Sequence, residues 1–207
     1  YFDLYPFDSI TLPDAPADDE ADIPEPARNG AVPGYALTAT PEQRRAAIRA
    51  YLACVSYVDA QVGRLLESLK QAGLDDNTII LFTSDHGWHL GEHGLWHKRS
   101  LFEESARVPF ILATPGMKTA GQRSDSLIEL VDVFPTLCDL TGIPSPKQME
   151  GKSLRPFLEN ASAELHDAAF TQARRGKNAE HWGRTIRTAR WRCTDWDEGK
   201  NGIELYD

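Results

Sequence analysis

The sequence predicts an α/β fold followed by a small antiparallel sheet, and three observations support this prediction. A helical pattern of apolar residues covers residues 41–71, and two short apolar runs at 78–83 and 108–113 are typical of buried strands. A further helical pattern follows at 126–141. Long helix, strand, loop, strand and helix is an order typical of an α/β domain. Beyond residue 158 come short alternating segments separated by turn residues, which indicate antiparallel strands.

The composition is that of a globular protein with enough apolar material for a core, since 41% of its 207 residues are hydrophobic and 26% are charged. A net charge of −9 argues against a general nucleic-acid binder, which needs a basic surface for phosphates. No apolar run approaches the ~20 residues of a membrane helix, and the first ten residues do not resemble a signal peptide. Three cysteines without metal-ligand spacing argue against a disulfide framework or zinc site, and we expect Cys54 and Cys138 in the core.

The first part of the chain divides into an irregular segment and a long helix. Residues 1–39 are rich in Pro and Asp and show no periodic pattern, so we expect them to run irregularly over the surface. The helix over residues 41–71 then begins with strong local signals, because Thr40 suits the N-cap and Gln43 completes a capping box with it. Gly73 is placed to terminate the helix.

The next elements define the predicted domain organisation. The strand at 78–83 is apolar on both faces, which favours a central strand of a parallel sheet covered by helices on each side. In the helix at 126–141, Pro135 predicts either a kink or the start of a second helical piece. We expect residues 1–158 to belong to the α/β domain and residues 159–207 to form a small, truncated α+β subdomain.

Residues 84–98 gather groups that bind metals and anions directly after the first strand. In open α/β sheets, ligands bind where loops leave the carboxyl ends of the strands. Asp85 offers carboxylate oxygens to a hard cation and His86 offers a ring nitrogen, while Gly87 permits a sharp turn of the backbone. The spacing alone leaves two interpretations open, which are a metal site and a hydrogen-bonded turn.

Lys98 lies beyond a glycine-bearing loop that can return its ammonium group to the same place. There it could hold a tetrahedral anion and stabilise charge on a leaving oxygen, although a lone lysine would ordinarily be an exposed surface residue. Glu92, His93 and His97 are candidates to orient the metal ligands or to line a substrate pocket. His89 is expected at a pocket wall or on the surface.

These residues carry a family resemblance. The stretch "TSDHGWHLGEHGLWHKRSLFEESARVPFILATPG" resembles the metal-and-lysine segment in the C-terminal part of the type I sulfatases, which belong to the alkaline phosphatase superfamily. The resemblance continues upstream through "YLACVSYVDAQVGRLLESLKQAGLDDNTIILFTSDHG" and downstream through "DSLIELVDVFPTLCDLTGIP", "GKSL" and "ELYD". The leader "LYPFDSITLP" and the His after the Asp make iduronate-2-sulfatase-like enzymes the nearest expected match. The implied fold is part of an alkaline-phosphatase-like α/β/α sandwich.

The resemblance also implies roles for individual residues. Asp85 and His86 match ligands of a single calcium ion, and Lys98 matches the catalytic lysine that contacts the substrate sulfate. The nucleophile of such enzymes is a formylglycine made from Cys or Ser in a C/S-x-P-x-R motif, which no cysteine of this chain occupies. We therefore expect the chain to be a fragment, inactive by itself, whose N-terminal portion carries the formylglycine.

The implied function is hydrolysis of a sulfate ester in a small molecule or glycan, by a secreted, periplasmic or lysosomal enzyme. Two alternatives remain open at this point. One is a phosphonate monoester or phosphodiester hydrolase of the same superfamily. The other is a non-catalytic relative that binds sulfated glycans.

Overall fold

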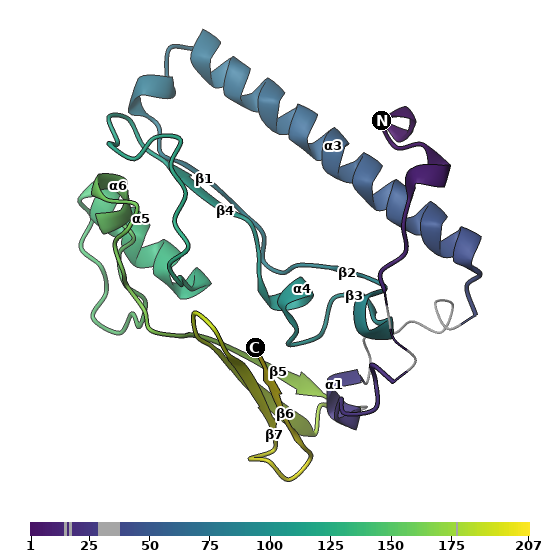
Figure 1. Ribbon diagram of the computed structural model, residues 1–207. Coiled ribbons are helices and arrows are strands. Elements are labelled where there is room, and N and C mark those ends of the chain that lie inside the picture. The colour runs from purple at the N-terminus through teal and green to yellow at the C-terminus, as the bar shows by residue number, and fades with distance from the viewer. Residues whose placement is uncertain (15, 17, 29–37, 177) are drawn as a thin grey trace.

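A long helix and a four-stranded sheet lie at opposite borders of the molecule (Figure 1). The computed structural model describes residues 1–207 with the exception of residues 15, 17, 29–37 and 177. Helix α3 (Pro41–Gln71) forms one border, and a two-stranded ribbon and a short hairpin lie between this helix and the C-terminal sheet. Among the described residues, no helix is long and apolar enough to cross a membrane.

Helix α3 begins and ends where its local signals place it. The Thr40 hydroxyl accepts a hydrogen bond from the Gln43 amide, and the Gln43 side chain accepts one from the Thr40 amide, so both bonds of the capping box are present. Gly73, with a φ of 65°, follows the C-cap residue in the left-handed region. Much of the apolar face of α3 is not packed against the described residues, since Val55 is 50% exposed and Leu65 is 69% exposed.

The two apolar strands pair with each other in the antiparallel direction. Strand β1 (Ile80–Thr83) pairs with β4 (Phe110–Ala113), and Ile80 lies opposite Ala113. The expectation of a central parallel strand with cover on both sides is therefore wrong for the described chain. An apolar run shows that a strand is buried in its complete fold, but it does not encode the direction of the neighbouring strand.

A hairpin within residues 84–98 joins two hydrophobic cores. Strands β2 (His89–Leu90) and β3 (Trp96–His97) pair in antiparallel fashion on either side of the turn η4 (Glu92–Gly94). Leu95 packs in one core and Trp96 in the other, because successive side chains of an extended segment point to opposite sides. The first core consists of Ile23, Ala27, Leu95, Leu101, Phe102 and Trp196, and the second of Ile10, Ile48 and Trp96.

The predicted helix at 126–141 begins later than the sequence indicates. Glu129 is extended, with φ −125° and ψ 153°, and a single 3-10 turn η5 (Leu130–Asp132) leads into α5 (Val133–Thr141). Pro135 lies in the first turn of α5, as expected of a proline that marks a helical start. The remaining short helical elements are η1 (Phe2–Leu4), η2 (Phe7–Ser9), α1 (Glu25–Arg28), η3 (Asp75–Asn77), α4 (Glu103–Ala106) and α6 (Pro156–Glu159).

The C-terminal strands form one antiparallel sheet, as predicted. They are β5 (Ala169–Arg175), β6 (His181–Arg187), β7 (Arg192–Trp196) and β8 (Ile203–Tyr206), hydrogen-bonded in chain order. One face of this sheet packs on the first core through Trp196, which is fully buried. The division of the chain at residue 158 into domain and subdomain stays a prediction.

The described parts of residues 1–39 follow an irregular path that α3 holds in place. The Tyr5 hydroxyl lies 2.7 Å from the Ser56 hydroxyl, and the Arg49 guanidinium donates to the carbonyl of Tyr5. The prediction for the cysteines was half right, because Cys138 is buried but Cys54 is exposed on α3.

Candidate functional site

Asp85, His86 and Lys98 meet beyond the end of strand β1. The Lys98 Nζ lies 2.6 Å from His86 Nε2, and Asp85 Oδ1 lies 3.5 Å from the same nitrogen. Asp85 directs its carboxylate to solvent, with 86% of its side chain exposed, whereas the His86 side chain is 30% exposed. The structure therefore brings together a carboxylate, an imidazole and an ammonium group, although twelve residues separate Lys98 from His86.

The hydrogen bonds of His86 fix its tautomer. An ammonium group has only donors, so Nε2 must accept from Lys98 and the ring proton must lie on Nδ1. Nδ1 then donates to the carbonyl of Gly87 at 2.7 Å. A backbone carbonyl bonded to one ring nitrogen is the usual partner of a histidine that ligates a metal through the other nitrogen.

Gly87 fits its position because the backbone of another element approaches it closely. A Cβ at residue 87 would lie 2.0 Å from the carbonyl oxygen of Glu104, and the Gly87 amide donates to the carbonyl of Ser105 at 2.8 Å. The site loop is thus tied directly to α4. We expected the glycine to permit a sharp turn, but this close approach of two backbones is what requires it.

Trp88 provides an aromatic wall beside the three residues. Its ring centroid lies 5.0 Å from that of His97, 6.3 Å from that of His86 and 6.1 Å from that of Tyr51 on α3. The sequence argument did not single out Trp88. Its position between two histidines was the available signal.

The structure places the other histidines and Glu92 in different surroundings. Glu92 accepts a hydrogen bond from the Leu90 amide, and His93 binds Asp19 at 3.1 Å. Neither is joined to Asp85, His86 or Lys98 by a hydrogen bond or ion pair within the described part of the chain, and their role in the site stays a prediction. His97 reaches the site through Trp88.

His89 is a buried structural residue, so its expected position at a pocket wall or on the surface was wrong. Its side chain is fully buried, its Nε2 lies 2.6 Å from the Ser100 hydroxyl, and burial lowers its pKa.

Asp85 and His86 are the residues of this chain that would hold the calcium ion implied by the resemblance. Asp85 offers carboxylate oxygens, and the His86 Nε2 nitrogen, 3.5 Å from Asp85 Oδ1, offers a lone pair that Lys98 occupies here. Within the described residues, no group of three or more His, Cys, Asp or Glu side chains is arranged to hold a metal ion. Calcium takes six to eight ligands. The two residues would therefore need ligands from outside this chain.

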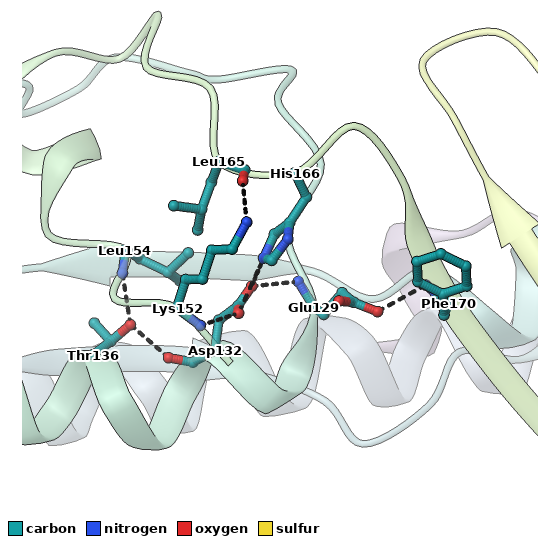
Figure 2. A network of polar contacts seen from close by, with 8 residues as sticks. All are labelled: Glu129, Asp132, Thr136, Lys152, Leu154, Leu165, His166 and Phe170. Atoms are coloured by element: carbon teal, nitrogen blue, oxygen red, sulfur yellow. Dashed lines mark hydrogen bonds and ion pairs between the residues drawn. The ribbon is translucent and has the colours of Figure 1, made fainter. Parts of the chain in front are cut away.

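A buried polar network holds the C-terminal sheet to the rest of the chain (Figure 2). The fully buried Asp132 accepts hydrogen bonds from the amides of Glu129 and Lys152, both at 2.8 Å, and lies 2.9 Å from His166 Nε2. The Glu129 side chain in turn accepts from the Phe170 amide at the start of β5. The sequence argument missed this network, since no local pattern links residues 34 positions apart.

A cavity lies against the C-terminal sheet, and none of the three site residues lines it. It has a volume of about 930 Å³ and is lined by α4, the segment 123–130 and the inward residues of the sheet. Arg187 and the buried Arg192 contribute positive charge to its lining.

Comparison with known families gives a consistent result over the whole chain. A family model described as sulfatase matches residues 13–143, and one described as the C-terminal part of N-sulphoglucosamine sulphohydrolase matches residues 91–207. A sulfatase of Formosa agariphila is 33% identical over all of this chain and 40% of its own length. An N-acetylglucosamine-6-O-sulfatase of Bacteroides thetaiotaomicron is 44% identical over 64% of this chain and 24% of its own length. Mouse (Mus musculus) iduronate 2-sulfatase is 33% identical over 93% of this chain and 48% of its own length.

Solved structures share the fold. A 2-O GAG sulfatase covers 95% of this chain with 45% of its own, at a TM-score of 0.79 and 31% identity. A structure in complex with its substrate D-glucosamine-2-N,6-O-disulfate covers 80% of this chain with 34% of its own, at a TM-score of 0.71 and 38% identity. The phosphonate monoester hydrolase of Agrobacterium radiobacter covers 81% of this chain with 36% of its own, at a TM-score of 0.72 and 32% identity. The chain thus spans less than half the length of each of these relatives.

Proposed function

This chain belongs to the sulfatase family, with an alkaline-phosphatase-like fold, and from that premise we propose that the protein containing it hydrolyses sulfate esters of sulfated glycans. The observation that carries the proposal is the convergence of Asp85, His86 and Lys98 at the end of β1. The substrate class is supported by relatives described as an N-acetylglucosamine-6-O-sulfatase and a 2-O GAG sulfatase.

Lys98 is proposed to act on the leaving group. Cleavage of the bond between sulfur and the bridging oxygen leaves negative charge on the departing alcohol oxygen. An ammonium group fixed beside that oxygen stabilises the charge as it develops. The hairpin β2–β3, which ends at His97, positions Lys98 for this role.

Asp85 and His86 are proposed to hold one divalent cation, which the resemblance implies is calcium. When bound, such a cation polarises the sulfate oxygens as a Lewis acid. His86 contributes a lone pair that its bond to Gly87 keeps oriented. Because one lone pair cannot serve two partners, metal loading would release Lys98 from His86 and leave its protons for the substrate.

The nucleophile is proposed to lie outside this chain. The family resemblance implies a formylglycine, and none of Cys54, Cys138 and Cys193 stands in the required C/S-x-P-x-R motif. The same resemblance leads us to propose a secreted, periplasmic or lysosomal protein that acts on an extracytoplasmic substrate.

The test is the turnover of an aryl sulfate by the full-length protein that contains this chain. We expect Lys98→Ala to lower kcat by on the order of 10² to 10³, the loss found when a single charge-stabilising group is removed. Lys70→Ala, which changes an exposed lysine at the end of α3, is the matched control and should keep wild-type turnover. Wild-type turnover by Lys98→Ala would refute the role of the lysine.

A phosphonate monoester hydrolase is the second candidate, because such an enzyme from Agrobacterium radiobacter shares the fold at 32% identity. Comparing kcat/KM for an aryl sulfate with kcat/KM for an aryl phosphonate monoester separates the two activities. Binding of sulfated saccharides without any turnover would instead identify a non-catalytic relative.

A further inference from the structure

Two arginines from distant parts of the chain lie close enough for the charge of one to act on the other. Arg99 follows Lys98 directly, and Arg175 ends strand β5 of the C-terminal sheet. Neither arginine forms an ion pair with a carboxylate among the described residues, although the chain carries a net charge of −9. In an acidic protein, two guanidinium groups without an acidic partner are a feature that requires a reason.

The fold brings the two arginines together through the segment that leaves Lys98. Leu101 packs against the sheet between β5 and β6, where a Cβ on Gly183 would come within 2.7 Å of the Leu101 side chain. Gly183 lies opposite Ala173, which also packs on this core. Arg175 is two residues beyond Ala173 and therefore points to the same face of the sheet, toward the segment that carries Arg99.

The surroundings of Arg175 leave its charge uncompensated. Its Nη1 donates to the carbonyl of Arg174, but its Nε is buried and has no hydrogen-bond partner in the part of the chain that the structure describes. Burial and the positive charge of Arg99 both lower the pKa of the Arg175 guanidinium. Arg99 adds a conformational cost, because its φ of 81° lies in the left-handed region that favours glycine. An anion between the two guanidinium groups would offset the repulsion and supply the missing acceptor.

We propose that Arg99 and Arg175 together bind a second negative group of the substrate, either a further sulfate or a carboxylate, while Lys98 faces the sulfate that is cleaved. This inference rests on the proposed function, since it concerns the same substrate. It predicts that the protein prefers polyanionic saccharides and that this preference comes from two residues outside the metal and lysine cluster. Arg99 follows Lys98 directly, so the pair includes the neighbour of the residue proposed to face the cleaved sulfate.

The experiment compares two substrates and two ligands in the full-length protein. The substrates are D-glucosamine-2-N,6-O-disulfate and 4-nitrophenyl sulfate, and the ligands for calorimetry are the same disulfate and glucosamine 6-sulfate. Arg99→Ala and Arg175→Ala retain the Cβ and the backbone constraint and remove the rest of the side chain, including the guanidinium. Arg184→Ala, on an exposed position of β6 facing the other side of the same sheet, is the matched control.

We expect each alanine variant to raise KM for the disulfate by on the order of tenfold, as for the loss of one charge-assisted hydrogen bond, with a clearly smaller effect on the aryl sulfate. Arg175→Lys should recover part of the loss, because it restores the charge but not the planar fork. Equal losses on both substrates, or no loss on the disulfate, would overturn the inference. The wild-type protein could lack sulfatase turnover while calorimetry still shows that the two arginines favour the disulfated ligand. That result would refute the proposed function and leave the inference about the arginines standing.

Discussion

Removing the carboxylate of Asp132 should open the network that joins α5 to the C-terminal sheet (Figure 2). In the substitution Asp132→Ala, the amides of Glu129 and Lys152 and the imidazole of His166 lose their acceptor in the interior. An unsatisfied buried donor costs roughly 1–3 kcal/mol, and removing one partner of a buried ion pair costs roughly 3–5 kcal/mol. We expect a loss of about 3–5 kcal/mol, because neighbouring waters will satisfy some of the donors.

Asp139 on the same helix supplies the control. It also accepts two hydrogen bonds, from Ser153 and Arg155, but its side chain is 40% exposed. Solvent can replace both partners there, so Asp139→Ala should cost no more than about 1 kcal/mol.

Hydrogen–deuterium exchange of the full-length protein measures both losses as changes in the free energy of local opening. In Asp132→Ala, exchange should accelerate in peptides that cover residues 129–136, 151–154 and 165–170, which the network connects. A loss below about 1 kcal/mol for Asp132→Ala, or an equal loss for Asp139→Ala, would refute the reasoning.

Three further predictions follow from single contacts. The Trp182 amide and His181 lower the pKa of the Asp197 carboxyl to about 2, so this carboxylate stabilises the end of the β6–β7 hairpin fully above pH 3.8. Asp197 in turn raises the pKa of His181, so the protonated imidazole stabilises the same end of the hairpin fully below pH 6.5. Protection of this hairpin against exchange should therefore peak between about pH 4 and 6.5, and a monotonic pH profile would contradict the pairing. Lys98→Ala should tighten calcium binding about tenfold in calorimetry, because the ammonium no longer occupies His86 Nε2, whereas weaker binding would reject the shared lone pair. In urea unfolding, Gly87→Ala should lower the free energy of unfolding by about 2–3 kcal/mol, because the new Cβ would clash with the Glu104 carbonyl. Gly63→Ala, at a position on α3 with open space around it, should raise the free energy of unfolding by about 0.5–1 kcal/mol. Equal effects of the two substitutions would contradict the close backbone contact at Gly87.

Part of the fold and of the site was predictable because the relevant signals are local. The capping box at Thr40 and the apolar periodicity placed α3, since both depend on residues within a few positions of one another. Asp85 and His86 are neighbours in sequence, and a short hairpin returns Lys98 to them. The order of these residues was sufficient to identify the candidate site.

Other features depend on which segments pack together. The apolar run of β1 did not reveal that β4 pairs with it in the antiparallel direction, because both directions bury the same side chains. The helical pattern over 126–141 did not show that Glu129 is extended, since its side chain and amide bond to Phe170 and Asp132 instead.

The sequence by itself determined the helix α3, the antiparallel character of the C-terminal strands and the grouping of Asp85, His86 and Lys98. Only the tertiary structure decided the pairing of Asp132 with His166 and the approach of Arg99 to Arg175. The physical reason is that dihedral preferences and side-chain periodicity act within a few residues. Contacts between distant residues depend instead on how whole elements pack and on which chain segments close against one another.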